Sequence, residues 1–232
     1  MAADVIRLFV GWDEREEVGS HVFLSSLMHT CSLPVSVTHL RKSQVAALYG
    51  TEIREGTNAF TWSRFLVPAM CDFTGFALFV DGADMMAVGD LAELWHMASP
   101  LTAVQVVKHN YQTRHPRKYV GTGMESVNSH YDRKNWASVM LMYCGHRAWR
   151  RVTPEWLEKA NPLDVLQLRF LEDRQIGDLP DNANVLIDEG QEVEQPILVH
   201  WTAGVPGFPM YADAPMAQEW RDQLKRVNHA ID

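Results

Sequence analysis

Two aspartates stand at the end of the most clearly bounded apolar run in the chain. Asp81 follows Phe76–Val80 directly, and Asp84 comes three residues later, after a glycine and an alanine. In open α/β sheets, ligands bind at the carboxyl ends of the strands, where Asp81 would lie. Two carboxylates this close repel each other unless one is protonated or a cation lies between them, and their oxygens suit Mg²⁺ or Mn²⁺ shared with phosphates. The competing interpretation is an ordinary Asp-Gly turn with a solvated second aspartate.

Arg64 and His200 are two further residues whose types fit a phosphate or metal site. Arginine is well suited to bidentate contact with phosphate or carboxylate, so Arg64 could pair with Asp81 and a diphosphate together. His200 follows the apolar run Ile197–Val199 and is a candidate metal ligand. The loop at Gly204 can turn backbone N–H groups toward a phosphate. Each residue taken alone is more typical of a surface arginine or a structural histidine.

Three weaker groups of polar residues remain. The strand end Phe9-Val10-Gly11-Trp12-Asp13 could cradle a base and a ribose, although it lacks the G-x-G-x-x-G pattern. A basic group in a long polar loop either closes over phosphates or an acidic substrate, or only solvates the loop. Its members are Lys108, His109, Arg114, Arg117 and Lys118. A late cluster could orient a bound substrate, or could be a solvated helix end. Its members are Glu172, Asp173 and the two catalytic candidates, Gln175 and Asp178.

The pattern along the chain predicts strands that alternate with helices. Short apolar runs predict strands at Val5–Val10, Pro34–Leu40, Phe76–Val80, Thr102–Val107, Ala137–Tyr143, Val185–Ile187 and Ile197–Val199. Helices are expected at Val18–Met28, Ser43–Tyr49, Trp62–Met70, Leu91–Met97 and Met216–Val227, with further helical segments in Pro154–Leu171 that Pro162 interrupts. Residues 108–135 are expected to form a long loop, and such loops tend to be functional. The alternation predicts one α/β domain, residues 1–232, with a mostly parallel central sheet flanked by helices.

The bulk composition narrows the class of protein. The 232 residues carry a formal net charge of −8, which disfavours nucleic acid as a partner because a nucleic-acid-binding face is usually basic. The three cysteines are an odd number and far apart, which argues against a disulfide framework and fits a reducing compartment. No apolar run approaches the length of a transmembrane segment, and the amino terminus lacks the pattern of a signal peptide. We therefore expect a cytoplasmic protein.

Taken in order, four stretches resemble the GT-A glycosyltransferases, and most closely the family 8 enzymes that include glycogenin and galactosyltransferases. Phe9 to Asp13 resembles the nucleotide-binding start of that family, and Thr61 to Pro68 its Ser-Arg-Phe helix. Phe79 to Asp84 resembles the strand with its Asp-x-Asp motif. Leu198 to Trp201, with Gly204 and Pro206, resembles its His-x-x-Gly segment. Weaker similarities are Asn135 to Leu141, and Leu179-Pro180 with Asn184. The order of the matches is more specific than any one of them.

The resemblance implies an enzyme that moves a sugar from a nucleotide sugar to an acceptor and retains the anomeric configuration. It implies that Asp81, Asp84 and His200 hold Mn²⁺, or Mg²⁺, on the diphosphate, and that Arg64 braces the first aspartate. The donor would be a uridine diphosphate sugar, and the acceptor an unidentified glycan, lipid-linked or small molecule. The positions implied to bind the nucleotide are Phe9, Gly11, Asp13, Arg64, Val80, Asp81 and Gly204.

Two departures from the family pattern leave other functions open. The turn is Asp-x-x-Asp, one residue longer than Asp-x-Asp, and Trp136 stands where the family tends to have a polar residue. A domain that binds a nucleotide sugar without turnover is one alternative. A sugar-phosphate nucleotidyltransferase is another, but that class usually opens with a glycine-rich basic loop, whereas Gly11 to Arg15 is acidic and poor in glycine.

Overall fold

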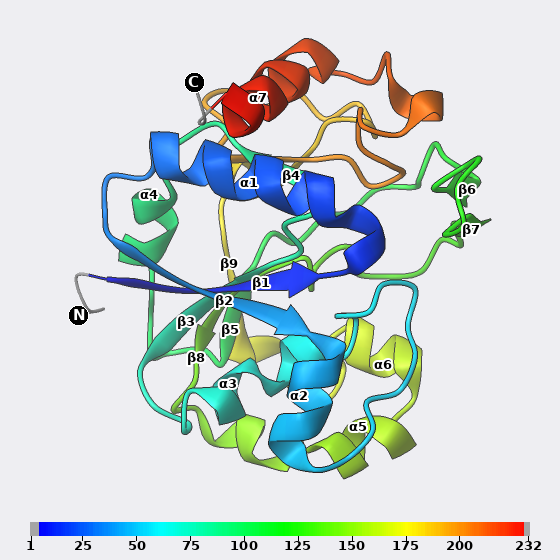
Figure 1. Ribbon diagram of the computed structural model, residues 1–232. Helices are drawn as coiled ribbons and strands as arrows, with labels where there is room; N and C mark the ends of the chain where they lie inside the picture. The colour runs from blue at the N-terminus through cyan, green and yellow to red at the C-terminus, as the bar shows by residue number, and fades with distance from the viewer. Residues whose placement is uncertain (1–4, 230–232) are drawn as a thin grey trace.

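A six-stranded sheet forms the centre of the protein in a computed structural model that describes residues 5–229 (Figure 1). The strand order is β2-β1-β3-β8-β5-β9, and β8 alone runs against its neighbours, which confirms the prediction of a mostly parallel sheet. Its strands are β1 (Ile6–Trp12), β2 (Val35–Arg41), β3 (Phe76–Val80), β5 (Val104–Val106), β8 (Val139–Tyr143) and β9 (Ile176–Asp178).

Helices cover both faces of this sheet (Figure 1). Above it in the view lie α1 (Glu17–Thr30) and α7 (Ala217–His229), and below it lie α2 (Lys42–Tyr49), α3 (Val67–Met70), α5 (Pro154–Lys159) and α6 (Pro162–Leu166). The helix α4 (Leu91–His96) lies between β3 and β5 along the chain. Within residues 5–229, none of the helices has both the length and the apolar character needed to cross a membrane.

Two smaller sheets complete the fold. One has the strand order β10-β11-β4 and consists of β4 (Met85–Ala87), β10 (Val185–Leu186) and β11 (Leu198–His200). The other is a hairpin of β6 (Arg117–Lys118) and β7 (Ser126–Val127). The hairpin lies inside the long polar region between β5 and β8, which is otherwise irregular, as expected.

Strands β1 and β3 are apolar along their length because they are buried on both faces. Leu8 and Leu78 pack in one core with Phe23 of α1. Phe9 and Phe79 point the other way and pack in a second core, below the sheet. Successive side chains of a strand alternate between its two faces, so a doubly covered strand appears in the sequence as an unbroken apolar run.

Besides the hairpin, three features differ from the predicted elements. The helix expected over Trp62–Met70 is a 3-10 turn, Ser63–Leu66, followed by the short α3. Strands β4 and β9 were not predicted, because three residues are too few to show a period. The strand β4 begins directly after the second aspartate, and β9 contains the catalytic candidate Asp178.

Candidate active site

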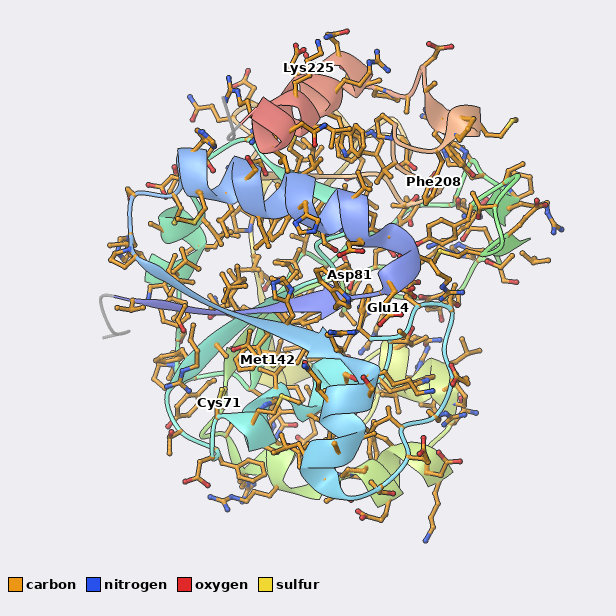
Figure 2. All side chains as sticks on the ribbon, in the orientation of Figure 1. Glu14, Cys71, Asp81, Met142, Phe208 and Lys225 are labelled. Carbon is orange, nitrogen blue, oxygen red and sulfur yellow. The ribbon has the colours of Figure 1, made fainter. Side chains whose placement is uncertain are left out.

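The acidic turn brings both aspartates to the carboxyl end of β3. Gly82 allows this path, because its φ is +82° and a Cβ there would come within 2.4 Å of Val10. The amide of Asp81 donates to the carbonyl of Ser138 at 2.9 Å, which ties the turn to β8. Asp84 is 6% exposed. Figure 2 shows Asp81 between the start of α1 and the end of β1.

Pairing of β4 with β11 brings His200 to the same place. The two strands are antiparallel, with His200 opposite Met85, so the histidine lies beside the end of the acidic turn. Its Nε2 is 3.3 Å from Oδ2 of Asp84. One ligand atom from each of Asp81, Asp84 and His200 lies within 4.8 Å of the others. The extra residue of the Asp-x-x-Asp turn therefore does not separate the two carboxylates. Oδ1 of Asp84 is buried and has no hydrogen-bond partner among residues 5–229, as a ligand atom for a cation would be.

A buried asparagine fixes the orientation of the histidine. His200 Nδ1 lies 3.1 Å from Oδ1 of Asn184, and the amide nitrogen of Asn184 donates to Oγ of Ser138 at 2.8 Å. An amide oxygen can only accept, so Nδ1 carries the hydrogen of this bond. Nε2, which faces the carboxylates, is then the nitrogen available to a metal. Partners of this kind set the tautomer and direction of metal-binding histidines.

Arg64 supplies a fixed positive charge at the turn. Its Nη1 is 2.7 Å from Oδ1 of Asp81. Its guanidinium also donates to two backbone carbonyls, those of Thr61 at 3.0 Å and Ala137 at 2.7 Å, and lies 5.0 Å from the centre of the Phe79 ring. The side chain is held from several directions at once, so its charge needs little reorganisation when a ligand binds.

The protonation of the cluster follows from its burial. Burial raises the pKa of Asp81 to about 6, against the opposing effect of Arg64. Burial also opposes ionisation of Asp84, but the charge and hydrogen bond of His200 outweigh it and lower the pKa of that carboxyl. In the same way, burial disfavours the imidazolium of His200, yet Asp84 raises the pKa of the ring. The carboxylate of Asp84 and the ring of His200 thus each favour the charged form of the other.

If the cluster is the metal site that the resemblance implies, binding of Mn²⁺ is expected to strengthen as the pH rises through about 6, the pKa of Asp81. Metal ligands bind in their deprotonated forms, so protons compete with the ion. The pKa values of Asp81 and His200 are both raised, so both residues hold protons at low pH and release them as the pH increases. Calorimetric titration with Mn²⁺ on either side of that pH measures the effect. An affinity that stays constant or falls with increasing pH would contradict this account.

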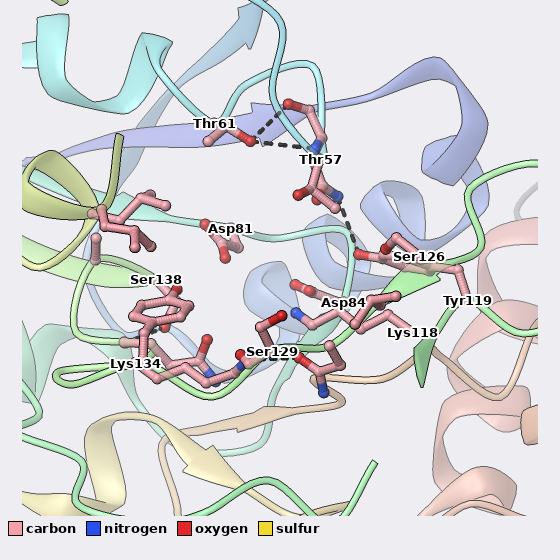
Figure 3. A pocket seen from close by; sticks show the side chains of 18 of the residues that line it. Thr57, Thr61, Asp81, Asp84, Lys118, Tyr119, Ser126, Ser129, Lys134 and Ser138 are labelled. Atoms are coloured by element: carbon pink, nitrogen blue, oxygen red, sulfur yellow. Dashed lines mark hydrogen bonds between the residues drawn. The ribbon is translucent and has the colours of Figure 1, made fainter. Parts of the chain in front are cut away.

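A cavity of about 280 Å³ opens over the acidic turn (Figure 3). Arg64, Asp81 and Asp84 form one part of its lining, and the polar region between β5 and β8 forms another. The remaining polar residues of the lining are Thr57, Asn58, Thr61, Lys118, Tyr119, Ser126, Asn128, Ser129, Tyr131, Lys134, Asn135 and Ser138. The long loop that the sequence marked as functional is thus a wall of the same cavity.

Four of the predicted nucleotide-binding residues do not belong to the lining of this cavity. Phe9 and Val80 are buried in the two cores. A Cβ at Gly11 would come within 2.4 Å of the ring of Phe60, and one at Gly204 within 2.5 Å of a tyrosine ring. The two glycines therefore permit close packing of aromatic rings. Direct contacts of these residues with a nucleotide stay predictions.

Asp13 lies at the end of β1 and is already engaged by its neighbours. Its carboxylate accepts hydrogen bonds from the Arg15 guanidinium at 2.6 and 2.9 Å and from the amide of Ala59 at 2.9 Å. It lines a second, open cavity of about 970 Å³ together with Trp12 and Arg41. This cavity lies at the carboxyl ends of β1 and β2, a position compatible with nucleoside binding. The nucleoside-binding role of Asp13 stays a prediction.

The structure does not bring Gln175 and Asp178 to the acidic turn. Gln175 precedes β9, which runs parallel to β5, so it lies at the opposite edge of the sheet from Asp81. Its Oε1 accepts from the amide of Glu172 at 2.9 Å in a capping box. Asp178 is exposed and pairs with Lys108 at 3.0 Å. The geometry lends no support to the catalytic roles predicted for these two residues.

Sequence patterns missed a buried polar group beside the cavity. Asn58 donates to the hydroxyl of Tyr119 at 3.1 Å and to the carboxylate of Glu16. Glu16 is 4% exposed, and burial together with the nearby Asp84 raises its pKa to about 8. The three members of this group come from distant parts of the chain. No local motif marks them, because only the folded chain brings them together.

Comparison with solved structures identifies the architecture as the GT-A glycosyltransferase fold, which confirms the resemblance. The galactosyltransferase LgtC, solved with donor and acceptor sugar analogues, aligns with a TM-score of 0.60 and 13% identity over 95% of this chain and 96% of its own. The glycosyltransferase GlyE of Streptococcus pneumoniae TIGR4 aligns with a TM-score of 0.60 and 14% identity over 96% of this chain, and the bifunctional glycosyltransferase WbbM with 0.59 and 12% over 95%. The chain spans 62% of the GlyE chain and 52% of the WbbM chain.

Sequence comparison places the chain in a family. It is 32% identical over 230 residues to Protein CDI of Arabidopsis thaliana, and the match covers 96% of this chain and 87% of that protein. The chain therefore belongs to the family of Protein CDI. No protein-family model matches it. Membership of glycosyltransferase family 8 stays a prediction.

Proposed function

We propose that the protein is a metal-dependent glycosyltransferase that moves a sugar from a uridine diphosphate sugar to an acceptor, with retention of configuration. The observation that carries the proposal is the convergence of Asp81, Asp84 and His200 within 4.8 Å, next to Arg64, at the carboxyl end of β3. Ligands bind at this edge of open α/β sheets. The GT-A fold supports the same class of reaction by analogy. A cytoplasmic site of action, which the odd number of cysteines favours, is part of the proposal.

The proposed metal is Mn²⁺. Two carboxylates and one imidazole form a mixed ligand set, which suits Mn²⁺ better than Mg²⁺, an ion that prefers oxygen ligands alone. When bound, the ion supplies positive charge to offset the negative charge that develops on the leaving diphosphate. Asn184 holds His200 with Nε2 toward Asp84, where it could bind the ion, and Arg64 keeps Asp81 in place. The leaving phosphate can accept the proton of the acceptor, so this scheme requires no general base from the protein.

A panel of nucleotide sugars tests the proposed function. Purified protein with Mn²⁺ is expected to hydrolyse one donor slowly in the absence of an acceptor, and EDTA is expected to stop the reaction. Release of nucleoside diphosphate is measured for uridine, guanosine and cytidine diphosphate sugars. Folded protein that releases nothing from any donor would refute the proposal. Calorimetric binding without turnover would instead favour the silent binding domain, and pyrophosphate release from a nucleoside triphosphate would favour the nucleotidyltransferase.

A further inference from the structure

The basic residues of the polar region between β5 and β8 differ in whether they have an ion-pair partner. Lys108 pairs with Asp178 at 3.0 Å, and Arg117 pairs with Glu125 at 2.6 Å. Lys118 lines the cavity, and within residues 5–229 its amine has neither an ion pair nor a hydrogen bond. Its charge acts on the two aspartates of the turn, whose ionisation it favours. A cation without a bonded partner in a polar cavity is a group ready to receive an anion.

Lys134 is a second cation on the same wall of the cavity. Its side chain is 4% exposed, and its Nζ donates to Oδ1 of Asn128 and to the carbonyl of Ser129, both at 2.6 Å. These acceptors are neutral, and among the described residues the amine has no bonded carboxylate, although the charge of Glu189 acts on it from a distance. Burial lowers the pKa of Lys134 to about 8. An anion bound in the cavity would offset this cost of burying a positive charge.

The balance of charge in the lining favours an anion. Its charged residues are Arg64, Asp81, Asp84, Lys118 and Lys134, so three cations face two carboxylates and leave one net positive charge. A divalent ion at the aspartates would raise the net charge to three. The diphosphate of a nucleotide sugar carries a charge of about −2, and a released nucleoside diphosphate about −3. The cavity thus matches the charge after bond cleavage better than before it, which is the condition for catalysis by differential binding.

The hairpin that carries Lys118 is fixed to the carboxyl-terminal part of the fold. The amide of the next residue, Tyr119, donates to the carbonyl of Ala203 at 2.7 Å, and its ring packs edge-on against Phe208. The amide of Val120 donates to the hydroxyl of Tyr211 at 3.0 Å. Lys118 therefore extends from a backbone that is already in place, and binding needs to order the side chain alone.

We propose that Lys118 and Lys134 bind the diphosphate of the substrate in the cavity whose lining also includes Asp81 and Asp84 (Figure 3). This inference rests on the proposed function for the identity of the substrate, but the ligand chemistry is that of a diphosphate. Lys118 is the direct ligand, because its amine is unpaired, and Lys134 is oriented toward the same space by Asn128 and Ser129. Inorganic pyrophosphate carries the same charged group without the base or the sugar.

Calorimetric titration with pyrophosphate in the presence of Mn²⁺ tests this site. Replacing Lys118 by methionine is expected to weaken pyrophosphate binding about 10- to 100-fold, the effect of one charge-assisted hydrogen bond. Lys118→Arg keeps the charge and is expected to retain most of the affinity. Lys159→Met, which removes an exposed lysine of α5, is the matched control and should leave binding unchanged. Binding of Mn²⁺ alone should not weaken in any of these variants.

The outcomes separate this inference from the proposed function. Wild-type protein that binds no pyrophosphate with Mn²⁺ overturns the inference, as does a Lys118→Met variant that binds it as tightly as the wild type. If pyrophosphate binding depends on Lys118 but no nucleotide sugar is turned over, the proposed phosphate site is supported and the proposed glycosyltransferase activity is refuted. If a nucleotide sugar is turned over and Lys118→Met does not slow the reaction, the glycosyltransferase activity is supported and the role of Lys118 is refuted.

Discussion

Replacing Asp81 by asparagine is expected to lower the rate of sugar transfer about 10³-fold, the upper range for loss of one preorganised electrostatic group. The change removes a ligand charge from the proposed metal site and keeps the size of the side chain. It also leaves Arg64, which lies 2.7 Å from Asp81, without its carboxylate partner. Initial rates with the best donor at saturating Mn²⁺ measure the effect, and calorimetry shows whether affinity for the ion falls as well.

An exposed aspartate provides the matched control. Asp222 on α7 pairs with Lys225 at 2.9 Å and lies outside the cavity lining, so Asp222→Asn makes the same chemical change without an expected effect on rate. Asp84→Asn is expected to resemble Asp81→Asn, because Asp84 contacts His200 directly. If both variants of the turn keep full Mn²⁺-dependent activity, the reaction takes place elsewhere in the protein.

Replacing Arg64 by methionine is expected to lower the free energy of unfolding by about 3–5 kcal/mol, because removing one partner leaves a buried ion pair uncompensated. Asp81 would lose its countercharge. The carbonyls of Thr61 and Ala137 would also lose the donors that now reach them at 3.0 and 2.7 Å. Urea denaturation at neutral pH measures the change. Much of the side-chain volume is retained, so the effect reports mainly on charge and hydrogen bonds.

Arg174→Met is the control for this experiment. Arg174 pairs with Glu172 at 2.7 Å, but the two side chains are 77% and 60% exposed, so water already screens the pair. No measurable loss of stability is expected there. An Arg64→Met variant as stable as the Arg174→Met variant would show that the buried pair contributes little to the fold.

The predictable part of the fold is the part with strong local patterns. Phe76–Val80 was predicted with the bounds observed, because a strand covered on both faces needs an unbroken apolar run. The placement of Asp81 followed from the same logic, since it is the next residue. His200 is the last residue of the short strand β11, and the structure brings it to Asp81 and Asp84, the residues with which the resemblance grouped it.

The remaining part of the site depends on long-range pairing that no local pattern encodes. The short β4 pairs with β11 and thereby sets the distance between Asp84 and His200. Asn184 reaches His200 only once those strands are paired. The position of Gln175 also depends on strand pairing that the sequence does not reveal. Its position at the far edge of the sheet depends on the direction of β9, which its three residues do not reveal.

The pairing of β4 with β11 also has a consequence for the thermal behaviour of the protein. Asp81 and Asp84 belong to the first half of the chain and His200 to its last part, so an ion held by all three would act as a reversible cross-link that closes a long loop. An ion that binds only the folded chain adds about 2.7 kcal/mol of stability when its free concentration is about 100 times its dissociation constant. Under the proposed function, the melting temperature would then rise with the free concentration of the ion. A chelator would lower the stability of the whole protein as well as empty the site.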